Sequence, residues 1–395
     1  MRLVDCTLHI APGAQAALDR LEQVEDVGFS PSGRRLALSG YANDSLAVAE
    51  VRIDRDDVRT RVTVGPVAHV VDARLAAPHG VCFLDESTLA VANRDGDLVL
   101  FHIPADLTTV AALEPVAVTG TGFTGLAGPS SVTTAPGPDG TTVLLVCNTH
   151  GRRVTRHTLH RLADGTIDRV DNGIAVDHRL DIPDGATVSP DGRWLAVSNH
   201  RHHLVMVYDF SAVLDGRDEP VAVLRGAAYP HALQFVAGGR ALLASDAGRP
   251  ELHLFVAAPD GWRGVVYPSR SQQVLDDASF ADGRMNSREG GIKGLALHPD
   301  GRLLALSARQ RSIAFADLSV ECEPVAPDER ARLAHELALI DENVEWRRLD
   351  AAYGEPSVPA PRTTTPAPAA PKKPRPTNRE RTRWVVTRAR RRLAR

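Results

Sequence analysis

The chain has 395 residues, 43% of them hydrophobic, and a formal net charge of −3 at pH 7. This length and composition allow a large buried core and exclude a disordered or fibrous chain. No apolar run approaches the roughly 20 residues of a bilayer-spanning helix, and Arg2 and Asp5 charge the N-terminus, so we expect a cytoplasmic protein without a secretory leader. The four cysteines show no CxxC spacing, which predicts neither a disulfide framework nor a zinc knuckle.

Six segments of the chain share one pattern. Each has an apolar run that ends in a Pro, Asp or Gly turn, a second apolar run, a polar hairpin and a third, alternating run. PHGVCFLDESTLAVANRDGDLVLFHI at residues 78–103 is one of them, and the other five begin near residues 24, 129, 183, 230 and 292. Apolar alternation interrupted by turn residues is typical of β-strands.

The spacing of these repeats predicts the fold. Residues at one corresponding position lie 54, 51, 54, 47 and 62 residues apart, which is long enough for four strands in each repeat. The fourth strand falls in connecting segments such as residues 67–73 and 221–226. Four-stranded units at this spacing indicate a β-propeller, in which each unit is one blade around a central channel. We therefore predict an all-β, six-bladed β-propeller with four-stranded blades over residues 1–325.

Closure of the ring requires an outer strand for the sixth blade, and two segments could supply it. Residues 3–11, LVDCTLHIA, and residues 320–326, VECEPVA, both have strand character. The sequence leaves the choice between them open.

The C-terminal region differs from the repeats. Apolar residues at near-helical spacing predict a helix within residues 326–354, and residues 355–376, rich in Pro, Ala and Thr, predict an extended linker. From Lys372 onward two lysines and nine arginines face one glutamate, a net charge of +10 that leaves the first 371 residues at −13. The basic tail, residues 377–395, is expected to be disordered and solvated, or to contact an acidic surface, an anionic membrane or nucleic acid.

Two columns of residues should converge on one rim of the channel, because the first strand of each blade starts there and the second strand returns there. The polar members of both columns are candidate ligand-binding residues. Turn chemistry is the alternative for the second column, because Asn and Asp bond their own backbone in hairpins. The start column consists of Glu25, His79, Ser130, Asp184, His231 and Lys293. The strand-end column consists of Gly40, Asn93, Asn148, Asn199, Asp246 and Ala308.

The start column contains two acids, two imidazoles and one amine, which is costly in a dry channel. Water at the rim would satisfy these groups. A divalent metal would also satisfy them, because converging carboxylates and imidazoles form a coordination shell. Such an ion could polarise a carbonyl or activate a water.

The segment VEDVGFSPSGRRLALSG, followed one repeat later by PHGVCF, resembles the six-bladed calcium-dependent hydrolases. These are the paraoxonase/arylesterase family, regucalcin and gluconolactonase; the pattern is also similar to lactonase-like and NHL-type propellers. The resemblance implies a metal held by acids and amides where the inner strands start. Glu25 would be a metal ligand, Asp26 its neighbouring acid and His79 the residue that positions water. Calcium would be the cofactor, and a lactone or ester the substrate.

Several positions depart from that family pattern. Ser130 and Asp184 stand where the resemblance implies two Asn ligands, and His231 falls near the family's last acid. The histidine favours manganese or zinc over calcium. Lys293 adds a positive charge that either pairs with an acid or orients an anionic ligand. We predict metal ligands at Glu25, Asp184 and His231, with His79 as the catalytic residue and Ser130 and Lys293 in ligand binding.

Two further segments are candidate sites. NHRHH, residues 199–203, is expected to form an exposed hairpin tip; the alternative is a metal site, because His200 and His202 are spaced to share a strand face. The long interval between the fifth and sixth repeats, residues 276–291, should lie over the same rim as a lid, with disorder as the alternative. Its Arg284 and Arg288 are candidate ligand contacts.

The sequence holds no GxSxG elbow, P-loop or Rossmann fingerprint, so it does not support a serine hydrolase or a nucleotide enzyme. The first expected function is metal-dependent hydrolysis of a small lactone or ester at the channel mouth. The alternative is a non-catalytic propeller whose rim binds a small molecule or a protein partner. Convergence of Glu25, Asp184 and His231 on one point would favour the first, and Lys293 filling that point would favour the second.

Overall fold

The computed structural model describes residues 1–56, 59–108, 112–117, 122–284, 289–309 and 311–322. All of them belong to the first of two compact units, residues 1–341. The predicted C-terminal helix, linker and basic tail lie outside the described residues. No helix in the described part of the chain is long and apolar enough to cross a membrane.

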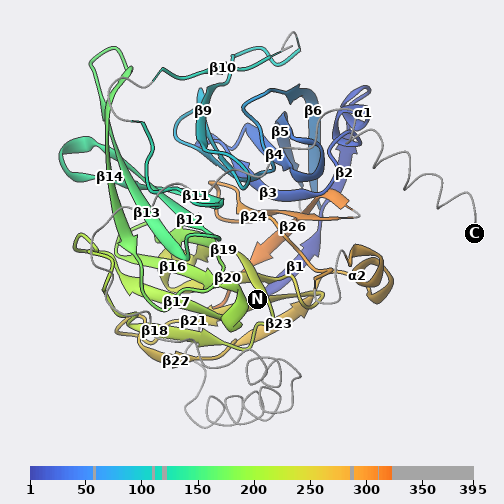
Figure 1. The fold of residues 1–395 in the computed structure, drawn as a ribbon. Helices are drawn as coiled ribbons and strands as arrows, with labels where there is room; N and C mark the ends of the chain where they lie inside the picture. The colour runs from blue at the N-terminus through green and yellow to red at the C-terminus, as the bar shows by residue number, and fades with distance from the viewer. Residues whose placement is uncertain (57–58, 109–111, 118–121, 285–288, 310, 323–395) are drawn as a thin grey trace, which may run out of the picture. The chain divides into compact units, whose positions relative to one another are not determined.

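Six β-sheets form the blades of a propeller, which confirms the predicted fold (Figure 1). The first four strands of each blade, counted from the inner strand outward, pair antiparallel, and the inner strands contact one another in turn until β24 returns to β3. The inner strands are β3 (Val24–Phe29), β7 (Pro78–Phe83), β11 (Pro129–Pro136), β15 (Pro183–Val188), β19 (Pro230–Val236) and β24 (Leu295–Leu297). The second strands are β4 (Arg35–Gly40), β8 (Thr88–Asn93), β12 (Thr142–Asn148), β16 (Trp194–Asn199), β20 (Ala241–Asp246) and β25 (Leu303–Ala308).

The outer halves of the blades vary more in length. The third strands are β5 (Ser45–Arg55), β9 (Leu98–His102), β13 (Arg153–Arg161), β17 (Leu204–Asp209), β21 (Glu251–Val256) and β26 (Arg311–Ser319). The fourth strands are β6 (Thr60–Val71), β10 (Glu114–Pro115), β14 (Ile167–Val176), β18 (Ala222–Arg225), β23 (Arg270–Gln273) and β1 (Arg2–Asp5). Two blades have a fifth strand, because β2 (Thr7–Ile10) pairs in parallel with β6 and β22 (Gly264–Val266) with β18.

Short helices connect these strands. The α-helices are α1 (Ala14–Leu18) and α2 (Asp277–Gly283), and the 3-10 turns are η1 (Tyr41–Asn43), η2 (Pro138–Gly140), η3 (His200–His202) and η4 (Ala237–Gly239). Helix α2 lies within the predicted lid, residues 276–291, and Asp276 caps its start by accepting a hydrogen bond from the Ser279 amide.

The N-terminal segment closes the ring. Strand β1 pairs antiparallel with β26, with Arg2 opposite Ser319 and Asp5 opposite Ala316. One residue later the chain enters β2 and joins the first blade. The first of the two sequence alternatives is therefore correct, although residues 3–11 are divided between two blades. Residues 320–322 form no strand, and residues 323–326 lie outside the described residues.

The hydrophobic core lies between the blades. In the described part of the chain, each cluster of buried apolar side chains combines two neighbouring blades, and together the clusters cover all six interfaces. The alternation of the strands explains this, since one set of side chains on each blade faces the blade before it and the other set the blade after it. Packing on both faces holds the inner strands, and hence the channel, in fixed positions.

The register of the inner strands breaks at the same place in five blades. The pairing of β3, β7, β11, β15 and β19 with their second strands shifts immediately beside the start-column residue. A β-bulge leaves residues unpaired and re-aims their side chains. In the first blade, Ser39 satisfies the freed backbone by accepting from the Asp26 amide at 3.0 Å and donating to the His79 carbonyl at 2.9 Å. The bulge therefore turns the start column into the channel and ties adjacent blades together.

Candidate functional site

The polar residues of the start column converge around the channel axis, as predicted. We call them the ring residues: Glu25, His79, Ser130, Asp184, His231 and Lys293. Five of them are the second residue of an inner strand, and Lys293 lies two residues before β24. Each is buried, with between 0% and 8% of its surface exposed. Ring residues of opposite blades face each other across the channel axis. The imidazoles of His79, in the second blade, and His231, in the fifth, stack with the centres of their imidazole rings 5.4 Å apart.

An unusual backbone precedes the ring in the first four blades. The residue two positions before the ring residue has a positive φ in each of them: Gln23 (60°), Ala77 (52°), Gly128 (69°) and Ile182 (56°). Left-handed backbone is strained for a β-branched residue such as Ile182. Its recurrence in four blades shows that this turn is how the chain bends into the inner strand.

Three ring residues form a compact group of potential ligands. One ligand atom each of Glu25, His79 and His231 lies within 4.8 Å of the other two. Glu25 Oε2 is 3.6 Å from His79 Nε2 and 3.4 Å from His231 Nε2. Asp184 lies on the other side of the imidazoles, with Oδ2 3.0 Å from His231 Nε2 and Oδ1 3.8 Å from His79 Nε2. Glu25, Asp184 and His231 thus meet around the axis, but His79 takes the place of Asp184 in the compact group.

His79 is oriented as a neutral imidazole. Its Nδ1 is 2.7 Å from the Ser130 carbonyl, and since a carbonyl only accepts, Nδ1 must donate. Burial lowers the pKa of His79 to about 3, and the nearby Arg94 adds to this. The Nε2 lone pair therefore faces carboxylate oxygens of Glu25 and Asp184 with no donor of its own. A backbone bond at one ring nitrogen and a free lone pair at the other is the usual state of a metal-binding histidine.

His231 is in the opposite protonation state. Burial alone would lower its pKa, but the two carboxylates of Asp184 and Glu25 outweigh burial and raise the pKa to about 9. Its Nε2 is buried and has no well-aligned hydrogen-bond partner, despite lying close to both carboxylates. Both acids remain ionised: burial opposes this, but Lys293 and His231 lower the pKa of Glu25, and His231 and Arg94 lower that of Asp184.

Two cations and one acid complete the cluster. Arg94, from the turn after β8, reaches across the channel mouth and places its NH2 group 2.6 Å from Asp184 Oδ1. Lys293 Nζ is 3.8 Å from Glu25 Oε2 and also pairs with Glu289. With His231 protonated, three cations therefore balance three carboxylates. Sequence reasoning missed Arg94 and Glu289. Arg94 directly follows the strand-end residue Asn93, as His200 follows Asn199, but the residue type at this position changes from blade to blade, and Glu289 lies in an interblade segment.

His200 also joins the cluster, and not as an exposed hairpin tip. It is buried in η3, with Nε2 3.4 Å from a Glu289 oxygen and Nδ1 4.0 Å from an Asp184 oxygen. The ring of Tyr229 packs edge-on against it at 4.7 Å. His202 instead has its Nδ1 3.2 Å from the Asn199 amide group, so the two histidines do not share a site.

The polar side chains of the strand-end column form hydrogen bonds with the backbone of nearby turns. Asn93 accepts from the Ala76 amide at 3.1 Å and donates to the Asp97 carbonyl at 2.8 Å, which ties the loop before its inner strand to the hairpin after its second strand. Equivalent local bonds occupy Asn148, Asn199 and Asp246. These bonds support the turn alternative, and ligand binding by these four residues stays a prediction.

The three remaining predicted contacts differ in their placement. Ser130 donates to the Pro183 carbonyl at 3.0 Å, so its hydroxyl links two blades. Arg284 is exposed, and its guanidinium carbon lies over the aromatic ring of Phe280, 5.1 Å from the centre of that aromatic ring. Arg288 lies outside the described residues.

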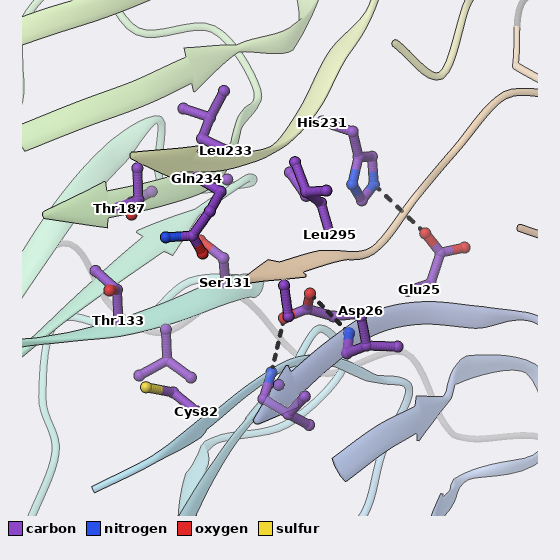
Figure 2. A pocket seen from close by; sticks show the side chains of 18 of the residues that line it. Glu25, Asp26, Cys82, Ser131, Thr133, Thr187, His231, Leu233, Gln234 and Leu295 are labelled. Carbon is purple, nitrogen blue, oxygen red and sulfur yellow. Dashed lines mark hydrogen bonds and ion pairs between the residues drawn. The ribbon is translucent and has the colours of Figure 1, made fainter. Parts of the chain in front are cut away.

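A cavity of about 180 Å3 runs from the ring along the inner strands (Figure 2). Figure 2 shows His231 and Glu25 on one side of this pocket and Thr133, Thr187 and Cys82 on the other. Asp26 lies along its wall, where its carboxylate accepts from the amides of Val27 and Val81 at 2.9 and 3.0 Å. The pocket therefore connects the ring with the interior of the channel.

The fold and the ring define a six-bladed β-propeller with a buried carboxylate and imidazole cluster that could hold a metal ion. No protein-family model matches the chain, and no curated protein matches it. Among solved structures, a "putative 6-phosphogluconolactonase" from Bacteroides uniformis is similar at 17% identity and a TM-score of 0.49, over 75% of this chain and 81% of that one. A functionally unknown protein from Desulfotomaculum acetoxidans is similar at 13% identity and a TM-score of 0.45, over 72% and 79%. Likenesses this weak assign no activity to the chain.

The two histidines should make opposite contributions to the pH dependence of stability in the metal-free protein. The folded pKa of His79, about 3, is below the ordinary value of 6.5, so its contribution to stability should fall as the pH drops below 6.5. The folded pKa of His231, about 9, is above it, so its contribution should fall as the pH rises from 6.5 to 9. Burial raises the pKa of the Asp26 carboxyl from 3.8 to about 7, so Asp26 should lower stability as the pH rises through that interval. Urea denaturation at pH 5, 6.5 and 9 measures this. His79→Gln should flatten the acid side and His231→Gln the alkaline side; stability that rises steadily to pH 9 would contradict the assignment.

Proposed function

We propose that this propeller is a metal-dependent hydrolase that acts on a small lactone or ester at the ring. The observation that carries the proposal is the compact group of Glu25, His79 and His231, in which two imidazole nitrogens and one carboxylate oxygen face one point. The orphaned Nε2 of His231 and the free lone pair of His79 fit a bound cation. Two nitrogen donors favour manganese or zinc over calcium.

The residues around the group have separate tasks. A bound divalent ion would polarise a carbonyl or lower the pKa of a water. The Ser130 carbonyl fixes the His79 ring, and Arg94 holds Asp184 beside both imidazoles. We propose that Asp184 accepts the proton of the attacking water, because it lies outside the ligand group but within 3.8 Å of it. His79 and Asp184 thereby exchange the roles expected from the sequence.

Lys293 is suited to stabilise negative charge on the substrate. Its ammonium carries three donors and lies 3.8 Å from Glu25, on the side of the ring that faces Glu289. A fixed cation beside a reacting carbonyl stabilises the oxyanion that forms there. The same cation opposes metal binding, so we expect the ion to bind with release of the His231 proton.

Metal content measured by mass spectrometry tests the proposal. Protein reconstituted with calcium, manganese and zinc should retain one ion, and Glu25→Ala, His79→Ala and His231→Ala should each lose it. Asp184→Asn should keep the ion but lose hydrolysis in a screen of lactones and esters. His157→Ala is the matched control, because His157 is equally buried but bonds within the third blade. A wild-type protein that takes up none of the three metals would overturn the proposal.

The alternative function is a binding propeller without a metal. The observation that favours it is the internal balance of charge, since Arg94, Lys293 and protonated His231 neutralise Asp184, Glu25 and Glu289 without any ion. A folded wild-type protein that contains no metal in the mass-spectrometric test would favour this function over hydrolysis.

A further inference from the structure

The channel below the ring is built in layers of different size. Inner-strand residues one position after the ring residue are mostly small: Asp26, Gly80, Ser131, Gly185, Ala232 and Gly294. A second layer, the far layer, stands three positions after the ring residues and is mostly polar: Gly28, Cys82, Thr133, Thr187, Gln234 and Ala296. The apolar residue between these layers, such as Val27 or Leu233, belongs to the core between blades. Alternation thus directs the small and polar layers toward the axis.

The two ends of this space differ in exposure. At the ring end, Glu25, His79, Asp184 and His231 are at most 4% exposed, and Arg94, Lys293 and His200 contact them on the rim side. At the far end Phe29, Thr133, Gln234 and Leu297 line the same cavity and are partly exposed. The cavity is therefore more open at the far end than at the ring.

Several polar groups on the cavity wall lack partners. Ser131 Oγ is buried and has no nitrogen or oxygen partner among the described residues, although it contacts the Cys147 thiol, a weak hydrogen-bonding group. The hydroxyls of Thr133 and Thr187 have none there either, and Gln234 uses only its amino group, on the Phe235 carbonyl at 3.1 Å. The Ser131 hydroxyl is buried, and such a group is expensive unless water or a ligand satisfies it. Thr133 and Gln234 are partly exposed, so their free hydrogen-bonding groups can bind water or a ligand that enters the cavity.

We infer that the channel below the ring is a binding subsite for a small uncharged molecule with several hydroxyl groups, which enters from the far end. The cavity of about 180 Å3 is smaller than the roughly 300–1,000 Å3 of sites for drug-sized ligands, so the molecule is small. The far layer carries hydroxyl and amide groups and no charged side chain, so it selects hydrogen-bonding groups and not an ion. This inference rests on the proposed function, because it identifies the substrate that would meet Glu25 and His231 from below.

Two lactones of the same ring size test the chemistry. D-Erythronolactone and γ-butyrolactone differ by two hydroxyl groups, and isothermal titration of the metal-loaded and metal-free protein compares their affinities. We expect erythronolactone to bind at least tenfold more tightly in both forms. Equal affinities, or binding of neither lactone, would overturn the subsite. The metal content of the same samples reports on the proposed function separately.

Single substitutions in the cavity lining test whether its hydroxyl groups cause the preference for erythronolactone. Thr187→Val and Ser131→Ala each remove one hydroxyl and should weaken erythronolactone binding about fivefold, as expected for one hydrogen bond. γ-Butyrolactone binding should not change. Thr134→Val is the control, because Thr134 is the neighbour of Thr133 on β11 but does not line the cavity. An equal loss in the control would contradict the assignment.

Tryptophan substitutions at the two ends test the direction of entry. Thr133→Trp narrows the far end, and Ala42→Trp adds the same side chain at an exposed position of η1 on the rim. We expect tenfold weaker erythronolactone binding for the first and a change below twofold for the second. Gln234→Trp replaces Thr133→Trp if that variant does not fold. The reverse result would show that ligands enter from the rim.

Discussion

Replacing Asp184 with asparagine is expected to lower the free energy of unfolding of the metal-free protein by about 3–5 kcal/mol. The carboxylate lies 2.6 Å from Arg94 and 3.0 Å from His231, and it is 4% exposed. Its removal leaves the Arg94 guanidinium, whose side chain is 22% exposed, without its charge partner, and the buried His231 imidazolium with only Glu25. The buried imidazolium has little water to solvate it, which explains most of the expected loss. Guanidinium denaturation of the wild type and the variant measures it.

Two controls isolate the buried charge as the cause. Asp171→Asn removes a surface aspartate that pairs with His160 and Arg169 and is 55% exposed, and it should cost less than about 1 kcal/mol. Adding Arg94→Met to Asp184→Asn should restore part of the lost stability, because the unpaired guanidinium is then gone. A loss below about 1 kcal/mol for Asp184→Asn would show that the cluster tolerates the uncompensated charges.

Replacing Gly185 with alanine is expected to destabilise the fourth and fifth blades by about 3 kcal/mol or more. A Cβ at this position would lie 2.1 Å from the His231 carbonyl oxygen, which is backbone and cannot rotate away. Overpacking usually costs about 1–3 kcal/mol, and a clash with backbone lies at or beyond the upper end. The clash moves the residue that carries the His231 imidazole, so we also expect loss of the metal uptake proposed for the ring.

The melting temperature and the metal content of Gly185→Ala measure both effects. Gly122→Ala is the control, because a Cβ there would meet nothing within 4 Å. A Gly185→Ala protein with wild-type stability and metal content would show that the inner strands can separate without harm to the ring.

The propeller and its ring could be predicted because both repeat. The start of the inner strand has a recognisable sequence pattern in every blade. Alignment of the six segments therefore identifies Glu25, His79, Asp184 and His231 from the sequence alone. The fourth strands near residues 67–73 and 221–226 were also correct, as β6 and β18. Repetition also identifies the strand-end column, whose Asn and Asp side chains hold turns.

The rest of the site could not be predicted because it does not repeat. Arg94 acts from the second blade on Asp184 in the fourth, and Glu289 acts from an interblade segment on Lys293 and His200. The pairs of Arg94 with Asp184 and of Glu289 with His200 join residues of different repeats, so no spacing within one repeat reveals them. The presence of His79 and not Asp184 in the compact group was not predictable either, since the distances between ring residues do not follow from the order of the blades.

The division of the first ten residues between two blades has a consequence for the order of assembly. Strand β1 pairs with β26, more than 300 residues later, while β2, one residue further on, pairs with β6 of the first blade. Contacts this distant in sequence form late, because a long loop must close before they stabilise anything. During synthesis β2 can dock early and hold the N-terminus in place, while β1 remains an unpaired edge until the sixth blade is complete. The last step of folding is then the seating of one short strand, and a chain that stops before β26 would retain an open edge that can pair with other chains.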